Sequence, residues 1–524
     1  MNYDYIIVGG GSAGCVLAGR LSEKSDVTVL LLEAGGSDRN ILFRWPAGFA
    51  KMTKGIASWG WSTVPQRHMQ SRVLRFTQAK VIGGGSSINA QLYNRGNALD
   101  FNEWRQLGCE GWNYEDVLPY FKRSEDFERC ADHYHSKGGP LGVSDPRSSL
   151  PICEAFFAAT GELGIPRNYD FNGPTQDGIG YYQLTQKNAR RSSTVTAYLN
   201  PASGRKNLNV KQNAIVRRLM IESHRTVGVE MMDGQIFKAD REVILTSGAI
   251  GSPKLLMQSG IGPADHLQSI GIKALLDLPG VGSNFQDHLD LFVISECTGD
   301  HTYDKYGKPH WAALAGLQYI LTKTGPVASS LFSQGGFWYA DENARSADIQ
   351  FHFGLGSGIE AGVAKMKNAG ATLNSAYMRP RSRGTVRLAS DDPNAAPLID
   401  PNYWADPYDK EMSIRGLRMA REIMNQKALK PFIKSEHLPG ANLKTDEELF
   451  NYACTNAKTD HHPAGTCKMG HDKMSVVNPA LKLHGLDGLR ICDASIMPTV
   501  VTGNTNAATI MIAEKAADMI KASY

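Results

Sequence analysis

The sequence predicts a mixed α/β fold that begins with a Rossmann-type βαβ unit. Asp4 to Val8 is a short apolar run that ends in glycines, and Val27 to Leu32 is a second apolar run. Such runs are typical of buried parallel strands. Between them, Cys15 to Leu21 holds helix-forming residues without a breaker. The length of 524 residues also exceeds what a single hydrophobic core holds, so we expect two lobes.

Hydrophobic periodicity predicts the remaining elements. Residues 39–110 are rich in Gly, Trp and Asn and show little periodicity, which is more typical of a functional stretch than of a disordered one. No repeat or low-complexity linker divides the chain, so we expect the two lobes to exchange segments. Helices are predicted at residues 112–130, 152–163, 249–258, 311–324, 407–426, 447–456 and 506–521, and strands within 208–230 and at 242–246, 349–353 and 489–492.

Composition and charge exclude several classes of protein. The net charge is +4 from 56 basic and 52 acidic side chains, and the basic residues are scattered, so no nucleic-acid partner is expected. The N-terminus lacks the pattern of an export signal, and no stretch approaches the roughly 20 apolar residues of a membrane helix. We expect a cytoplasmic protein with at most peripheral membrane contact. The eight cysteines are unclustered, which predicts reduced thiols and no metal site.

The turn between the first strand and helix carries a dinucleotide-binding fingerprint. Gly9, Gly11 and Gly14 form the pattern GxGxxG, which permits a tight turn, close approach to a pyrophosphate, and close helix–strand packing. Glu33 ends the second strand 24 positions after Gly9, where a carboxylate can accept hydrogen bonds from both ribose hydroxyls. The fingerprint alone does not separate FAD from NAD. The following Ala34 and the N-terminal position of the motif favour FAD.

The chain resembles the glucose–methanol–choline (GMC) oxidoreductase family over nearly its whole length. Four blocks carry the resemblance: residues 5–35; AKVIGGGSSINA at 79–90; GAIGSPKLLMQSGIGP at 248–263; and HPAGT at 462–466 with DASIMP at 493–498 and GNTN at 503–506. Within the family, residues 48–53, 304–306 and 325–329 are most similar to bacterial dehydrogenases that include L-sorbose dehydrogenase. Choline dehydrogenases and long-chain alcohol dehydrogenases are similar to a lesser degree.

The resemblance implies two interleaved domains and FAD as cofactor. Residues 1–155, 205–295 and 450–524 would form a Rossmann-type FAD-binding domain, and residues 156–204 and 296–449 a substrate-binding domain built on an antiparallel sheet. Ile88 stands where some members carry the histidine that tethers FAD covalently, so we expect non-covalent FAD. The implied FAD contacts are Gly9, Gly11, Ser12, Ala13, Gly14, Glu33 and Ala34 for the ADP half, Gly84, Ser87, Asn89 and Ala90 beside the pyrophosphate and flavin, Val216 at the adenine, Asp493 and Ala494 at the phosphates, and Thr505 and Asn506 at the flavin ring.

The resemblance also implies the catalytic residues. His462 matches the family's base, and histidine suits that role because its ordinary pKa is about 6.5. Asn504 matches the partner position, where an amide can donate to the substrate oxygen but cannot take the proton at neutral pH. His461 would orient substrate or only pack. Asp460 would either raise the pKa of His462 or point to solvent.

Two further segments are open to more than one interpretation. Alternation in the predicted strand 349–353 places Phe351 and Phe353 on one face and His352 on the other. We predict Phe351 and Phe353 as substrate-pocket residues, although a plain core strand fits equally well. The pair Asp287-His288 is expected to be structural and near the cofactor.

The predicted function is that of an FAD-dependent dehydrogenase that converts a primary alcohol, such as a sugar or polyol like L-sorbose, into the aldehyde. A quinone or dye would accept the electrons. The alternatives are an oxidase that reduces O2 to hydrogen peroxide, a choline dehydrogenase-like enzyme, and a hydroxynitrile lyase-like flavoprotein without redox chemistry. No aromatic cage for the choline cation can be identified from the sequence.

Overall fold

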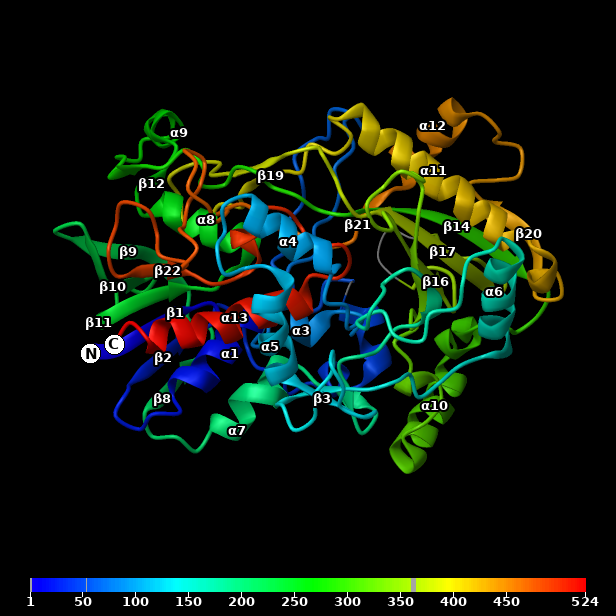
Figure 1. Ribbon diagram of the computed structural model, residues 1–524, viewed down its shortest axis with the longest axis horizontal. Helices are drawn as coiled ribbons and strands as arrows, with labels where there is room; N and C mark the ends of the chain where they lie inside the picture. The colour runs from blue at the N-terminus through cyan, green and yellow to red at the C-terminus, as the bar shows by residue number, and fades with distance from the viewer. Residues whose placement is uncertain (1, 53, 360–363) are drawn as a thin grey trace.

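The computed structural model describes residues 2–52, 54–359 and 364–524, so Thr53, the last residue of the segment 48–53, lies outside the described residues. Two seven-stranded sheets lie side by side, one at the left and one at the right of Figure 1. Each sheet has its own large hydrophobic core. Among the described residues, no helix combines the length and apolar character needed to cross a bilayer.

The first sheet contains the predicted Rossmann unit. Its strand order is β8-β2-β1-β11-β10-β9, with β22 also paired to β11. The pairs of β1 with β2, β2 with β8, β1 with β11, and β11 with β22 are parallel, while β9 and β10 form an antiparallel extension. The strands are β1 (Asn2–Val8), β2 (Val29–Leu32), β8 (Leu208–Lys211), β9 (Val216–Glu222), β10 (Arg225–Met231), β11 (Ile236–Leu245) and β22 (Leu489–Ile491).

Three helices, α1 (Ser12–Leu21), α5 (Tyr114–Ser124) and α13 (Asn506–Lys521), pack together beside this sheet. Glu514 of α13 is fully buried and accepts hydrogen bonds from Arg20 at 2.8 Å, Arg123 at 2.8 Å and Tyr198 at 2.6 Å. A buried carboxylate needs such partners, because its desolvation would otherwise be very costly. Glu514 therefore ties α13, which directly follows the segment Gly503 to Thr505, to α1 and α5.

The second sheet is wholly antiparallel, with the order β20-β14-β17-β16-β15-β5, and β21 also pairs with β14. Helix α11 (Pro407–Met424) packs on β14 and β17. The strands are β5 (Gly178–Tyr181), β14 (Leu289–Cys297), β15 (Gln334–Trp338), β16 (Ile349–Gly354), β17 (Gly370–Tyr377), β20 (Ile433–Leu438) and β21 (Lys458–Thr459).

The predicted fold class is confirmed, with a parallel Rossmann sheet and a separate antiparallel sheet. The predicted domain boundary at residue 295 falls inside β14, which belongs to the antiparallel sheet. We propose to move that boundary to the start of β14. The remaining elements are α2 (Phe49–Met52), α3 (Gly85–Ile88), α4 (Ala98–Gln106), α6 (Pro151–Glu162), α7 (Asn200–Ala202), α8 (Gly248–Gln258), α9 (Ala264–Ser269), α10 (Pro309–Thr322), α12 (Asp446–Asn456), β3 (Glu125–Phe127), β4 (Leu141–Val143), β6 (Gln186–Lys187), β7 (Arg190–Arg191), β12 (Ile261–Gly262), β13 (Leu276–Asp277), β18 (Thr385–Arg387) and β19 (Leu398–Asp400).

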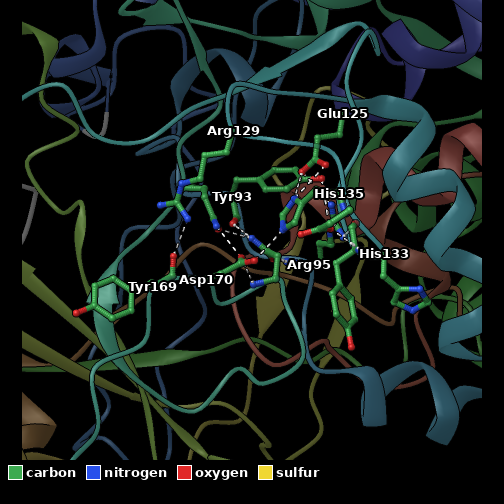
Figure 2. Close-up of polar contacts among 12 residues, drawn as sticks. Tyr93, Arg95, Glu125, Arg129, His133, His135, Tyr169 and Asp170 are labelled. Carbon is green, nitrogen blue, oxygen red and sulfur yellow. Dashed lines mark hydrogen bonds and ion pairs between the residues drawn. The ribbon is translucent and has the colours of Figure 1, made fainter.

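The helix predicted at 112–130 ends at Ser124, because a buried ionic network requires an extended chain from Glu125 onward. Figure 2 shows this network. The Glu125 carboxylate lies 2.9 Å from Arg95 Nη2 and 3.1 Å from His135 Nδ1, and His135 Nε2 lies 2.9 Å from Asp170. Burial alone would lower the pKa of His135, but the carboxylates of Asp170 and Glu125 raise it to about 9.

This raised pKa predicts that the network loses stability at alkaline pH. Protonated His135 contributes its full stabilisation below its ordinary pKa of 6.5, and the contribution disappears as the pH rises through about 9. The free energy of unfolding should therefore fall in this window by up to about 3 kcal/mol. Urea denaturation at a series of pH values should show the fall in the wild type and not in His135→Gln. The exposed neighbour His133 supplies a control, since His133→Gln should leave the pH dependence unchanged.

Candidate active site

A cavity of about 630 Å³ opens at the carboxyl ends of β1, β2 and β11. In open α/β sheets this edge is where nucleotides bind. The cavity extends from the fingerprint turn to the C-terminal histidines. It is lined by the predicted residues Gly9, Gly11, Ser12, Ala13, Glu33, Ala34, Gly84, Asn89, Ala90, Val216, His461, His462, Asp493, Ala494, Asn504, Thr505 and Asn506. Gly14 and Ser87 are not among the lining residues.

Gly9 and Gly14 are required for steric reasons, whereas a Cβ on Gly11 would lie 3.8 Å from Thr246 O, at ordinary contact distance. Gly9 has φ +108°, and a Cβ there would lie 2.6 Å from Thr246 O. A Cβ on Gly14 would lie 1.9 Å from Gly9 O. Gly14 therefore allows α1 to pack closely against the end of β1, and it is not itself a lining residue of the cavity. Gly11 caps α1 without a side-chain hydrogen bond. The first N–H groups of the helix are therefore available to an anionic phosphate.

Glu33 is buried at the end of β2, as the fingerprint requires. Its carboxylate accepts hydrogen bonds from Gly10 N at 2.8 Å and Gly35 N at 2.6 Å. Burial raises its pKa to about 7, although these two bonds and the charge of Lys80 oppose the rise. A carboxylate oxygen keeps a second lone pair, so Glu33 can still accept from ribose hydroxyls.

A second glycine loop closes over the first. Gly83 N donates to Gly10 O at 2.7 Å, and a Cβ on Gly84 would lie 2.6 Å from Gly11 Cα. Bare backbone thus faces the cavity from both loops, which fits the close approach of a dinucleotide. Ser87 was predicted as an FAD contact. Its side chain is instead fully buried, and its hydroxyl donates to Ile82 O at 2.9 Å and so supports the loop from behind.

The rest of this loop is held from the side opposite the fingerprint turn. Arg191 donates to Asn89 Oδ1 and to Asn89 O, both at 2.7 Å. Ile88 lines the cavity at the position of the covalent tether in some GMC proteins. Because its side chain has no nucleophilic atom, FAD attachment at this position is ruled out.

Pairing between β14 and β21 brings two polar segments of the chain together. Leu289 pairs with Thr459 in antiparallel register, and Asp460 N donates to His288 O at 2.9 Å. Just beyond the paired residues, Asp287 Oδ1 accepts a hydrogen bond from His462 N at 2.7 Å. Asp287 and His288, which were expected to be structural and near the cofactor, therefore lie directly behind residues 460–462.

His288 determines which nitrogen of His462 carries the proton. His288 Nε2 lies 3.2 Å from Met378 O, and a carbonyl can only accept, so His288 Nε2 is the donor. Burial lowers the pKa of His288 to about 4, so the ring is neutral and its Nδ1 is an acceptor. His462 Nδ1, 3.0 Å away, must then donate to it. This leaves His462 Nε2 without a proton, so that it can act only as an acceptor.

Asn504 faces that nitrogen from the start of α13. Asn504 Oδ1 accepts from Asn94 Nδ2 at 2.7 Å and from Gln350 Nε2 at 3.2 Å. Its amide nitrogen is thereby turned toward His462 Nε2, 3.1 Å away. A substrate hydroxyl placed at this pair can donate to the imidazole and accept from the carboxamide. Neither Asn94 nor Gln350 was predicted from the sequence. Asn94 lies just outside one of the four matching blocks, and Gln350 lies far from all of them.

Asp460 points to the base and not to solvent. Its Oδ2 lies 3.3 Å from His462 Nδ1, and its side chain is only 12% exposed. The net pKa of His462 is nevertheless low. Burial lowers the pKa of His462 well below its ordinary value, and neighbouring His288 and Lys458 add to this lowering. The His462 ring is therefore neutral near pH 7.

A charged cluster supports Asp460. The carboxylates of Asp290 and Asp460 and the ring of His352 lie within 4.8 Å of one another, the spacing of a possible metal site. The ammonium of Lys458 lies 3.0 Å from Asp290 and 3.9 Å from Asp460, and it supplies the positive charge there. His461 lines the cavity beside this cluster, and burial lowers its pKa to about 3, so it is a neutral wall residue.

The prediction of Phe351 and Phe353 as pocket residues is wrong. Both side chains are fully buried in the core of the second sheet, and Phe353 stacks on Phe156 of α6 at 4.5 Å. Because side chains alternate along β16, Gln350 and His352 face the catalytic segment instead. The strand does border the site, but through its polar face.

The glycine cradle, the buried acid and the adjoining imidazole–carboxamide pair are arranged as in flavin-dependent oxidoreductases. Two family profiles, both described as GMC oxidoreductase, match residues 3–290 and 380–513. The chain therefore belongs to the GMC oxidoreductase family. It is an FAD-dependent oxidoreductase that acts on CH–OH groups.

Individual proteins agree with this assignment over the whole chain. Mitochondrial choline dehydrogenase from Mus musculus is 41% identical over 99% of this chain and 89% of its own length. Oxygen-dependent choline dehydrogenase from Paraburkholderia xenovorans is 42% identical over 99% of this chain and 94% of its own. Pyridoxine 4-oxidase from Mesorbium loti superposes with a TM-score of 0.90 at 32% identity, covering 99% of both chains. Formate oxidase from Aspergillus oryzae gives a TM-score of 0.93 at 27% identity, covering 100% of this chain and 98% of its own.

The steric role of Gly14 predicts that Gly14→Ala abolishes FAD binding, because the new Cβ would push α1 away from the fingerprint turn. Flavin absorbance per polypeptide after gel filtration measures the effect. Gly161→Ala in α6 is a matched control, since its Cβ would meet no atom within 4 Å and should leave the flavin content unchanged. A Gly14→Ala protein with full flavin content would contradict this account of the turn.

Proposed function

We propose that the chain is a dehydrogenase that oxidises a primary alcohol to the aldehyde with His462 as the base. The observation that carries the proposal is the unprotonated His462 Nε2, which accepts a hydrogen bond from the Asn504 amide at 3.1 Å in the cavity wall. Bound FAD supplies the two-electron acceptor for the hydride of the carbinol carbon. A quinone or dye, rather than O2, is the proposed final electron acceptor.

The residues around His462 divide the proton chemistry among them. His462 Nε2 takes the hydroxyl proton, while the Asn504 amide donates to the substrate oxygen and stabilises its developing negative charge. The protonated ring is held through Nδ1 by His288 at 3.0 Å and by the Asp460 carboxylate at 3.3 Å. Asp460 thus acts as a positioning residue that stabilises the imidazolium formed during reaction.

Choline is the first substrate candidate, and sugar alcohols such as L-sorbose are the second. The names of the relatives favour choline. The Asp460 carboxylate, which lies in the cavity wall beside the base, also favours a cation. The second candidate rests on the sequence resemblance alone. The mouse relative is named as mitochondrial, so a cytoplasmic location stays a prediction.

A screen of anaerobic flavin reduction tests the substrate. Choline, its neutral carbon isostere, L-sorbose and simple primary alcohols are mixed with the enzyme in a stopped-flow instrument. We expect choline to reduce the flavin faster than its isostere if the cluster at Asp460 recognises charge. Reoxidation should be faster with a quinone analogue than with air. A flavin that none of the alcohols reduces would instead favour non-redox chemistry.

Replacing the base should slow the chemical step while the cofactor stays bound. His462→Ala is expected to slow flavin reduction at least about a hundredfold, because general-base assistance is lost. His437→Ala, an exposed histidine on β20, is the control and should react at the normal rate. A His462→Ala enzyme with its full flavin content and a near-normal rate would remove His462 from this role.

Neutralising Asp460 should weaken the base without emptying the site. Asp460→Asn is expected to slow flavin reduction about tenfold, because a carboxylate this close favours the protonated imidazole. The loss should be equal for choline and its neutral isostere if Asp460 acts through His462, and larger for choline if it also binds the cation. Asp460→Glu should restore part of the rate, and Asp391→Asn, on an exposed loop, should have no effect.

A further inference from the structure

Helix α10 (Pro309–Thr322) projects from the body of the protein at the lower right of Figure 1 and buries only Ala315 and Tyr319. The described chain exposes sixteen large apolar side chains, and five of them lie on these fourteen residues. Such a concentration is unusual for a surface helix, whose apolar side normally faces the core. The five are Trp311 (39% exposed), Leu314 (54%), Leu317 (54%), Ile320 (56%) and Leu321 (73%).

The exposed apolar face points away from the protein. Tyr319 attaches the helix to the body, since its hydroxyl donates to Ala189 O at 2.7 Å and its ring packs edge-on against Trp45 at 5.5 Å. Leu314, Leu317 and Leu321 follow one another by three and four residues, so they form one stripe on the other side of the helix. All three leucine side chains of this stripe are exposed to solvent.

Lysines lie at both ends of α10, because Lys308 immediately precedes the helix and Lys323 immediately follows it. Lys305 lies 5.4 Å from the Trp311 ring centroid, and α10 itself contains no acidic residue. Near the start of the helix, a Cβ on Gly307 would lie 3.7 Å from Lys365 Nζ. Burial, and then the like charges of Lys51 and Lys365, lower the pKa of Lys54. The basic set is Lys51, Lys54, Lys305, Lys308, Lys323 and Lys365.

We propose that α10 and these six lysines form a docking surface for an anionic lipid bilayer. The helix would lie in the plane of the interface, with Leu314, Leu317 and Leu321 among the acyl chains and the lysines against the anionic headgroups. No described helix can cross a bilayer, so the contact is peripheral. A second copy of the chain is a poorer occupant, because a two-fold contact through this face would bring like lysines together.

Flotation of the flavin-loaded, full-length enzyme with phosphatidylcholine vesicles, with and without phosphatidylglycerol, tests the proposal. We expect binding to the anionic vesicles only, with affinity falling as salt rises. The triple variant L314Q/L317Q/L321Q should bind at least about tenfold more weakly. Lys308→Gln should weaken binding about fivefold, as loss of one lysine near a charged surface does.

The controls distinguish binding through this surface from nonspecific adsorption of apolar side chains and from misfolding. The variants I236Q and L275Q alter exposed apolar side chains elsewhere and should bind like the wild type. Unchanged flavin absorbance and melting temperature would show that the triple variant is folded. Equal binding to neutral and anionic vesicles, or no binding to either, would overturn the proposal. So would self-association in sedimentation velocity that the triple variant abolishes, because a second copy would then cover the helix.

Discussion

The site depends on one buried imidazole that is held at both ring nitrogens. His462 Nδ1 donates toward His288, and His462 Nε2 faces the Asn504 amide. A buried ring without these partners would carry unsatisfied polar atoms and would have no preferred tautomer. The backbone carbonyl of Met378 fixes the direction of the whole chain of hydrogen bonds, because it can only accept. The tautomer of His462 is therefore set by Met378, which directly follows β17 of the antiparallel sheet.

The two sheets contribute different halves of the chemistry. The parallel sheet presents backbone: bare glycine loops, an uncapped helix start and a buried acid at the ends of its strands. The antiparallel sheet and its neighbours present side chains, including Gln350 of β16 and the segments on either side of the β14–β21 pairing. Asn504 precedes α13, which Glu514 fastens to the parallel-sheet side. Substrate would thus meet both lobes at the imidazole–carboxamide pair.

Charge around the base has two opposite effects. Burial keeps His462 neutral at rest, which is the state needed to accept a proton. Asp460 at 3.3 Å favours the protonated state once it forms. Lys458 limits this second effect by its contacts with Asp290 and Asp460. The balance lets the imidazole change charge inside a poorly solvated site, where an isolated charge would be very costly.

The sequence alone predicted the Rossmann unit, which the structure confirms, and it predicted the cofactor cradle and the histidine–asparagine pair, which the structure brings to one cavity. These features depend on local requirements, such as backbone that only glycine allows, or on short motifs with fixed spacing. The roles of His288, Asn94 and Gln350, the direction of Asp460 and the burial of Phe351 and Phe353 were decided by tertiary structure. Each depends on which strands pair and which face of a strand meets the cavity. Residues close in sequence share a pattern, but a hydrogen bond between positions 288 and 462 exists only because β14 and β21 pair in one register.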